Sequence, residues 1–213
     1  MAACVDMGFK KMVTNRLLRA VLLMAACLCL GWADSWEGIR AAAGKVDALS
    51  ADFVQEKHLP ILAEPLVSKG RLSYRRPDSL RWEYTFPVQS VLLMHDGDAR
   101  RFVQSDKGLV EDAGVRLQAM QFVMPEISGW FAGRFENNPL FEARLQGADR
   151  ILLSPKDPGM ARFIQRIELH MSERPGVIDQ VLIFESEDAY TRMVFSNTQI
   201  NPMLDEHLFR KVR

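Results

Sequence analysis

Hydrophobic and polar residues alternate over most of the chain after residue 50, and this pattern predicts β-strands. In the segment 80–86, leucine, tryptophan, tyrosine and phenylalanine alternate with arginine, glutamate and threonine. A period of two places the four large apolar side chains on one face of a strand. That face must be covered by a packed core or by an apolar ligand. Further strands are predicted at 51–59, 67–74, 88–94, 100–104, 140–146, 150–154, 163–171, 177–185 and 190–196.

Short turn sequences separate the predicted strands. Pro77 ends one strand because its ring fixes its own φ and disfavours helix at the preceding residue. The segment 95–98 contains Asp-Gly, the strongest short signal for a hairpin. Strands joined by tight turns predict an antiparallel meander rather than alternating strands and helices. The sequence shows no internal repeat and no linker, so we expect one domain with about eleven strands.

Two segments depart from the strand pattern. The segment 34–51 has apolar residues at three- and four-residue spacing, which predicts an amphipathic helix. The segment 111–135 is apolar nearly all round and is interrupted at Pro125 and near Gly129, which predicts one or two short buried helices. These helices are either an ordinary cover over the sheet or a mobile lid. The helical spacing in the first segment is set by Trp36, Ile39, Ala43 and Val46.

The first 33 residues have the pattern of a secretory signal peptide. Basic residues precede an apolar stretch at 20–30, which is too short for an ordinary membrane span, and Gly-Trp-Ala follows at 31–33. We therefore expect cleavage after Ala33 and a single folded domain at 34–213. An alternative is a lipoprotein-processing site that would make Cys27 the acylated N-terminus. All three cysteines lie before residue 33, so the mature domain would contain no disulfide.

The composition excludes some classes of function. Of the 213 residues, 48% are hydrophobic and 25% are charged, and the net charge is zero, so nucleic acid is not an expected partner. No G-x-S-x-G motif and no phosphate-binding glycine loop occurs. His95 and Asp98 could ligate a metal, but the Asp-Gly turn between them explains the spacing better. We therefore predict neither an enzyme nor a bound metal or cofactor.

Several short motifs in the first half of the chain occur in an order known from one family. The motifs are Phe53-x-Gln55-x-Lys57, Lys69-Gly70-x-Leu72, Arg76-Pro77-Asp78, Trp82, and Leu93-x-x-Asp96-Gly97. With these motifs in this order, the chain from about 33 to 97 resembles the periplasmic outer-membrane lipoprotein carrier family, the LolA-like proteins. The resemblance is weaker from about 141 to 195.

This resemblance implies a fold that is mainly β with some α. The expected fold is a single incomplete antiparallel β-barrel of about eleven strands, covered by an N-terminal helix and a helical lid. The resemblance also implies a monomeric periplasmic carrier whose hydrophobic cavity shields the acyl chains of lipoproteins between the inner and outer membranes. The implied partners are lipoproteins, an inner-membrane ABC-type lipoprotein release complex and an outer-membrane lipoprotein receptor.

Specific residues can be assigned to the implied cavity. The arginine that precedes Pro77, Arg76, matches a family position that holds lid carbonyls when the cavity is empty, whereas without the resemblance it would be a solvated turn residue. The candidate cavity residues are Leu72, Tyr74, Leu80, Trp82, Tyr84, Leu93, Met120, Val123, Met124, Ile127 and Phe131. Three alternatives stay open: a lipidated outer-membrane receptor of similar fold, a carrier of another lipid or acyl product, and a periplasmic hydrolase.

Overall fold

The protein forms one antiparallel sheet of eleven strands with a few short helices. A computed structural model describes residues 36–112, 126–136, 138–147 and 149–212. The strands are β1 (Ala48–His58), β2 (Leu66–Arg75), β3 (Ser79–Phe86), β4 (Ser90–His95), β5 (Asp98–Ser105), β6 (Gly108–Glu111), β7 (Phe141–Gln146), β8 (Arg150–Pro155), β9 (Arg166–Met171), β10 (Ile178–Phe184) and β11 (Tyr190–Ile200).

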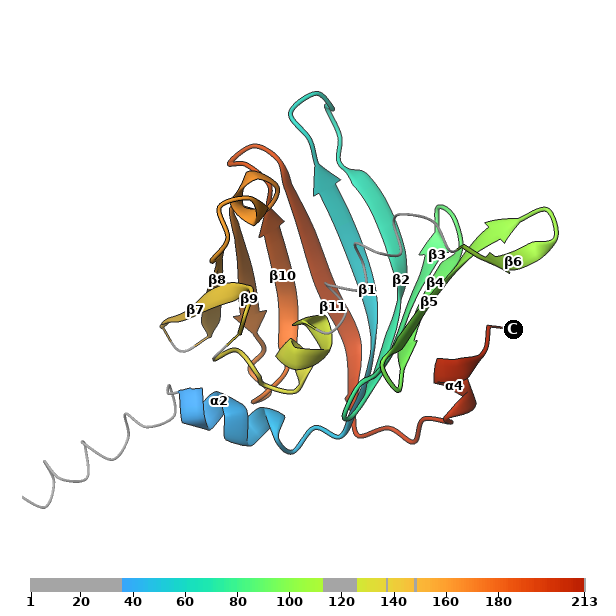
Figure 1. The fold of residues 1–213 in the computed structure, drawn as a ribbon, viewed down its shortest axis with the longest axis horizontal. Helices are drawn as coiled ribbons and strands as arrows, with labels where there is room; N and C mark the ends of the chain where they lie inside the picture. Colours follow the sequence, from blue (N-terminus) through green and yellow to red (C-terminus); the bar gives the residue numbers. More distant parts are fainter. Residues whose placement is uncertain (1–35, 113–125, 137, 148, 213) are drawn as a thin grey trace, which may run out of the picture.

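Two meanders, β1–β6 and β7–β11, make up this sheet. They are joined where β1 pairs with β11, with Phe53 opposite Phe195. The sheet bends so strongly that the two meanders face each other as two walls (Figure 1). Strands β6 and β7 lie at opposite ends of the strand order, so the described strands do not close into a ring. The predicted incomplete barrel is therefore confirmed.

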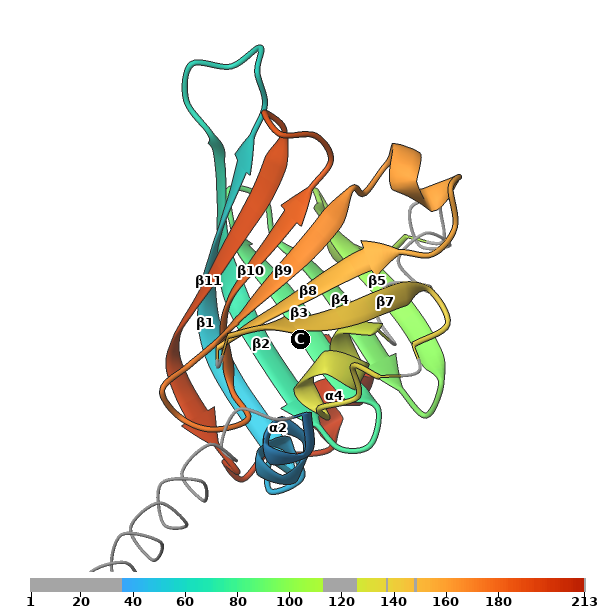
Figure 2. The same cartoon turned by 90° about the vertical axis from the view of Figure 1, so that its left-hand side faces the viewer.

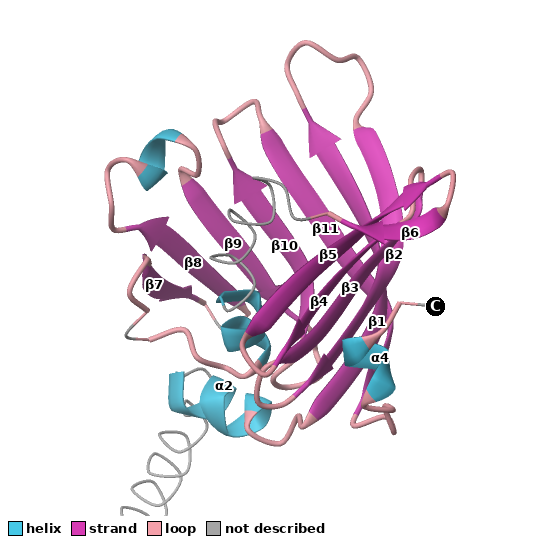
Figure 3. Ribbon diagram, turned by 45° about the vertical axis from the view of Figure 1, so that its right-hand side comes forward, coloured by secondary structure: helices cyan, strands magenta, loops and turns pink. Residues whose placement is uncertain are grey.

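Two of the helical segments lie at one end of the walls. Helix α2 (Trp36–Ala43) and the helical segment 126–131 lie where the walls converge (Figures 1 and 3). We call this the helical end. The loops β1–β2, β3–β4, β8–β9 and β10–β11 lie at the other end, the open end, because neighbouring strands are antiparallel. The β1–β2 loop extends well beyond the other loops (Figure 2).

Some predicted boundaries were wrong. The helix predicted at 34–51 ends at Ala43 in the described part, and β1 already begins at Ala48, because residues 48–51 pair with β2. Strand β6 replaces the start of the helical region predicted at 111–135. The strand predicted at 163–171 begins only at Arg166, after a short 3₁₀-helix, η2 (Met160–Arg162).

The concave side of the sheet carries the main core. Phe53 packs there with Trp82 and Tyr84, at ring-centroid distances of 4.9 and 5.3 Å. Its ring lies over Gly70 of the neighbouring strand, where an added Cβ would stand 2.5 Å from Phe53 Cζ. Gly70 therefore gives the aromatic side chain its space, and the Lys69-Gly70 motif has a packing reason.

A smaller core lies on the convex side of β4 and β5. Val91 and Phe102 form this cluster with Leu93, and Val212 packs against it. Helix α4 (His207–Arg210) covers β3 and β4 nearby, with Phe209 only 1% exposed. Phe209 therefore docks the C-terminal segment on the convex side of the sheet.

Candidate functional site

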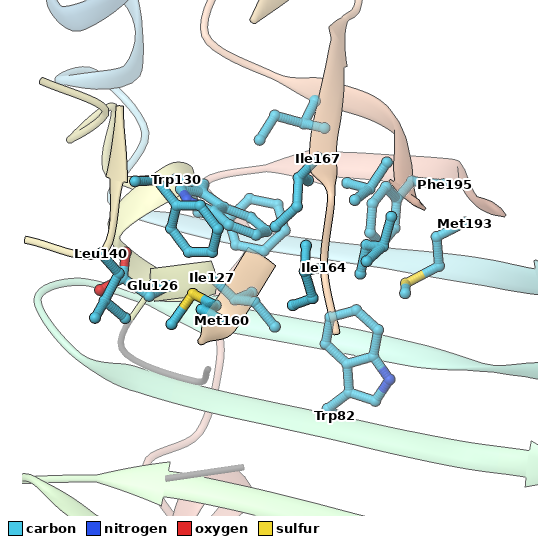
Figure 4. Close-up of a pocket in the computed structure, with 15 residues that line it drawn as sticks. Trp82, Glu126, Ile127, Trp130, Leu140, Met160, Ile164, Ile167, Met193 and Phe195 are labelled. Atoms are coloured by element: carbon cyan, nitrogen blue, oxygen red, sulfur yellow. The ribbon is translucent and has the colours of Figure 1, made fainter. Parts of the chain in front are cut away.

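An apolar cavity lies on the concave side of the sheet (Figure 4). Its volume is about 90 Å³. Strands β9–β11 and the β8–β9 loop form most of its wall, Trp82 of β3 closes it from the opposite wall, and the helical segment 126–131 covers it. The lining residues are Trp82, Glu126, Ile127, Trp130, Phe131, Leu140, Phe141, Met160, Ile164, Ile167, Ile178, Val181, Ile183, Met193 and Phe195.

The helical cover is held by aromatic contacts to both walls. The Phe131 ring lies 5.7 Å from that of Tyr74 on β2 and 6.1 Å from that of Phe195 on β11. Phe195 in turn lies 6.2 Å from Trp82 on β3. Segment 126–131 thus packs against both walls through Phe131, and its displacement would enlarge the cavity.

The structure brings together only part of the predicted cavity set. Trp82, Ile127 and Phe131 line the cavity. Leu72 and Leu80 belong to the same buried core but lie in its filled part, as does Tyr74. Met120, Val123 and Met124 lie outside the described residues.

Two predicted residues lie elsewhere. Tyr84 packs against the core from the concave side, and its hydroxyl donates to Gln55 Oε1 at 2.8 Å. Leu93 lies on the convex side, in the cluster with Val91. Successive residues of a strand alternate between faces, so Leu92, opposite Trp82, occupies the concave position that had been assigned to Leu93.

The sequence did not assign the C-terminal strands to the cavity. Ile167, Val181 and Met193 come from three adjacent strands and face the same interior. The alternation of apolar and polar residues in 163–171 and 177–185 predicted strands there. Alternation does not indicate which interior the apolar side chains enter, because that depends on the pairing of β11 with β1.

Arg76 binds the C-terminal end of α2. Its Nη2 donates to the carbonyl of Ala43 at 2.8 Å, and its Nη1 to that of Gly44 at 3.3 Å. The last carbonyls of a helix lack partners within the helix and carry partial negative charge, which a guanidinium satisfies. Arg76 thus holds backbone carbonyls, but they are those of α2 and not of the covering segment 126–131. It is therefore not simply a solvated turn residue, and its role as a latch stays a prediction.

Helix α2 also contacts turns from other parts of the fold. An added Cβ at Gly133 would stand 2.6 Å from Ala43 Cβ, and one at Gly176, in the β9–β10 turn, 2.6 Å from the carbonyl carbon of Ala42. Both glycines have positive φ. The helical end is thus a tight junction of α2 with the covering segment and with both walls.

A polar cluster lies beneath the cover, next to the same junction. Burial raises the pKa of Tyr74, and Arg76 and Arg134 oppose this effect. Polar side-chain interactions of the Tyr74 hydroxyl with Arg76 and Ser128 oppose it as well, so these groups lie close together between the cover and the wall, although none of the hydrogen bonds among them has normal geometry.

Several large apolar side chains are exposed in the loops of the open end. Ile61 at the tip of the β1–β2 loop is 89% exposed, and Phe163 in the β8–β9 loop is 74% exposed. Such residues usually mark a surface that meets another molecule when they lie together. The other large exposed apolar residues of these loops and their flanks are Leu62, Leu66, Phe86 and Val88.

The described residues hold no group of three or more histidine, cysteine, aspartate or glutamate side chains that could bind a metal. His95 instead joins the C-terminal segment to the sheet: Ser79 Oγ lies 2.8 Å from its Nδ1, and Arg210 Nε donates to its Nε2 at 3.0 Å. The turn interpretation of 95–98 is consistent with the backbone, since Asp96 and Gly97 both have positive φ.

Comparison with known proteins identifies the family. The family described as outer membrane lipoprotein carrier protein LolA matches residues 44–211. The chain belongs to the LolA family. No curated protein matches the sequence. The LolA-family resemblance read from the motifs at 53–97 is thereby confirmed.

The comparison with solved structures found weak similarity to, among others, three from named bacteria. A LolA superfamily protein from Nitrosomonas europaea, NE2245, is 11% identical with a TM-score of 0.46, covering 83% of this chain and 98% of that one. A putative outer membrane lipoprotein-sorting protein domain from Vibrio parahaemolyticus is 10% identical with a TM-score of 0.41, covering 82% and 94%. A chain of the MucA/MucB complex of Pseudomonas aeruginosa is 16% identical with a TM-score of 0.41, and the match covers 84% of this chain and 61% of that one.

None of the helices in the described part of this LolA-family chain is long and apolar enough to cross a membrane.

Proposed function

We propose that this LolA-family protein is a periplasmic carrier that shields the acyl chains of lipoproteins and moves them from the inner to the outer membrane. The observation that carries the proposal is the apolar cavity beneath segment 126–131. Fourteen of its fifteen lining residues are apolar or aromatic, and the exception, Glu126, is engaged by the side-chain amide of Asn138. Such a lining binds hydrocarbon and offers no group for catalysis.

The cavity is too small to hold its cargo in the described conformation. Pockets for drug-sized ligands typically measure roughly 300–1,000 Å³, whereas this cavity measures about 90 Å³. Binding of an acyl chain therefore requires segment 126–131 to move away from the walls. The described state corresponds to the empty carrier, in which aromatic residues of the cover occupy the space.

The free energies of the closed, empty protein and the open, loaded protein support a carrier that can also release its cargo. Each methylene moved from water into the cavity gains about 0.8 kcal/mol, so about ten methylenes gain about 8 kcal/mol. Opening sacrifices the packing of Phe131 against Tyr74 and Phe195. Because closure recovers these interactions, the protein's own cover competes with the cargo and lowers its net affinity.

The proposed route of the cargo crosses the periplasm. A signal peptide at 1–33, cleaved after Ala33, would deliver the protein to the periplasm. There it would accept lipoproteins from an inner-membrane ABC-type release complex and pass them, without enzymatic chemistry, to an outer-membrane lipoprotein receptor. The exposed apolar residues Ile61 and Phe163 support the open end as the side that would meet these partners.

A pair of neighbouring residues tests the cavity. Ile164 lines it, whereas Phe163 points into solvent. In the Ile164→Glu variant a carboxylate would enter the cavity, so we expect binding of a fluorescent fatty acyl ester to fall at least tenfold. Phe163→Glu introduces the same charge one residue away and should leave binding of this soluble probe unchanged. Equal binding by both variants and the wild type would refute the cavity as the acyl site.

Lipids that co-purify with the protein would identify its cargo. Mass spectrometry of protein isolated from the periplasm should find triacylated lipoprotein. Recovery of a different lipid alone would make the protein a carrier of that lipid instead. The intact mass of the same preparation would show whether the chain begins after Ala33 or at an acylated Cys27, which would indicate a receptor.

A further inference from the structure

The concave wall next to the cavity has polar side chains in defined positions. Arg101 lies opposite Leu92, which lies opposite Trp82, so the three form one row across β5, β4 and β3 on the concave side. Residues directly opposite each other in a sheet share a face. One step nearer the open end, the Tyr84 hydroxyl donates to Gln55. The apolar cavity is thus bordered by hydrogen-bonding groups.

Trp82 connects the cavity to this polar border. Its ring lines the cavity, while its Nε1 is buried and has no hydrogen-bond partner among the described residues. Figure 4 shows the nitrogen on the side of the indole away from Trp130. Burial raises the pKa of Tyr84, and a polar side-chain interaction with the Trp82 indole, followed by the charge of Arg101, opposes this effect. The indole N–H therefore lies near the Tyr84 hydroxyl, which itself donates to Gln55, but the two form no hydrogen bond of normal length and angle. A buried N–H donor without a partner is unfavourable, and a ligand that supplies an acceptor would satisfy it.

The charges on this wall are already balanced. Arg101 Nη1 contacts Asp112 Oδ2 at 2.7 Å, and Lys57 Nζ contacts Glu185 Oε1 at 2.7 Å. Each cation therefore has its own carboxylate. A ligand with a negative charge would find no unpaired cation at this border, and it would lose its hydration on entry.

From this arrangement we infer that the border at Trp82, Tyr84 and Gln55 is a subsite for a neutral hydrogen-bond acceptor, the ester or amide carbonyl that links an acyl chain to its head group. Trp82 Nε1 donates to this carbonyl, while the hydrocarbon chain occupies the enlarged cavity. The site thereby selects esterified or amidated acyl chains over free fatty acids and plain hydrocarbons. This inference rests on the proposed acyl-chain binding and adds the chemistry of its polar end.

Competition among three ligands of similar chain length tests the subsite. Methyl laurate, laurate at pH 8 and tridecane each displace a fluorescent acyl probe from the wild-type protein. We expect the ester to bind more tightly than the hydrocarbon by roughly threefold to tenfold, the worth of one intramolecular hydrogen bond. Laurate should bind more weakly than the ester.

Two matched variants assign the donor. Trp82→Phe keeps an aromatic ring but removes the N–H, so the preference for ester over hydrocarbon should fall to about one. Trp130→Phe removes an indole N–H from the cover instead of the wall; this N–H is also buried and unpartnered among the described residues at the cavity. This variant should keep the preference for ester over hydrocarbon. The same preference in the Trp82→Phe variant as in the wild type, or its loss only in Trp130→Phe, would overturn the assignment.

Infrared spectroscopy gives a readout that a purely structural role of Trp82 would not change. The carbonyl stretch of bound ¹³C-labelled methyl laurate should shift to lower frequency in the wild type and lose that shift in Trp82→Phe. An identical carbonyl band in both proteins contradicts the subsite. If ester and hydrocarbon bind equally well, only the subsite fails. If neither binds, the proposed acyl-chain carrier fails with it.

Discussion

Arg76 provides the sharpest test of how the carrier closes. In the described state its guanidinium donates to the carbonyl of Ala43 at 2.8 Å and to that of Gly44 at 3.3 Å. The first bond has ideal length and is partly buried, whereas the second is long and exposed. Arg76→Leu removes both and leaves the backbone bond from Arg76 N to Asp47 O in place. The variant thus weakens the junction at α2 without removing the strand.

The expected size of the effect follows from these bonds. A hydrogen bond from a charged donor contributes about 1.5–3 kcal/mol. We take about 2 kcal/mol as the loss to the closed state, since only the shorter bond is expected to contribute fully. This shifts the balance between closed and open protein by about 30-fold. If cargo binds the open state, apparent affinity for an acyl probe rises by up to that factor.

The assay is a titration with a fluorescent acyl ester, followed by transfer of bound lipoprotein to the outer-membrane receptor. Arg76→Leu should bind the probe more tightly and release lipoprotein more slowly than the wild type. Arg75→Leu is the matched control, because Arg75 is the neighbouring arginine and its guanidinium lies over the Phe209 ring on the convex side. Lower stability with unchanged affinity and unchanged transfer would show that Arg76 merely caps α2, and would refute its role as a latch.

Two further predictions concern stability. Phe209→Ala removes a buried side chain from the convex side, so we expect a loss of about 3 kcal/mol and a melting temperature lower by roughly 6–12 °C. Met203→Ala, at a fully exposed site in the same segment, should change neither, and an unaltered melting temperature in Phe209→Ala would contradict the docking. Burial raises the pKa of Glu56, but hydrogen bonds and charges from Arg192 and His58 lower it by more than burial raises it. The pKa of Glu56 in the folded protein therefore lies below the unfolded value of about 4.3. Its stabilising effect is therefore present above that value and is lost as the pH falls through the folded pKa, so urea unfolding should show a smaller loss between pH 5 and pH 3 for Glu56→Gln than for wild type. Parallel pH profiles would contradict this reasoning.

The sequence by itself determined most of the strands and their turns. Alternation identified β3 with its apolar face, and Asp96-Gly97 identified the β4–β5 hairpin, because both signals are local. The boundary between α2 and β1 was not determined locally. Residues 48–51 fit a helix about as well as a strand, and only their pairing with β2 makes them a strand.

Only the tertiary structure decided which apolar side chains surround the cavity. In β4 the four residues from Val91 to Met94 are all buried, since the convex side of this strand is also covered. Alternation therefore could not distinguish Leu92 from Leu93. The wall formed by β9–β11 comes to face Trp82 because β11 pairs with β1, a contact between segments far apart in the chain. The local sequence pattern shows which residues of a strand share a face. Where that face lies in the molecule depends on long-range strand pairing.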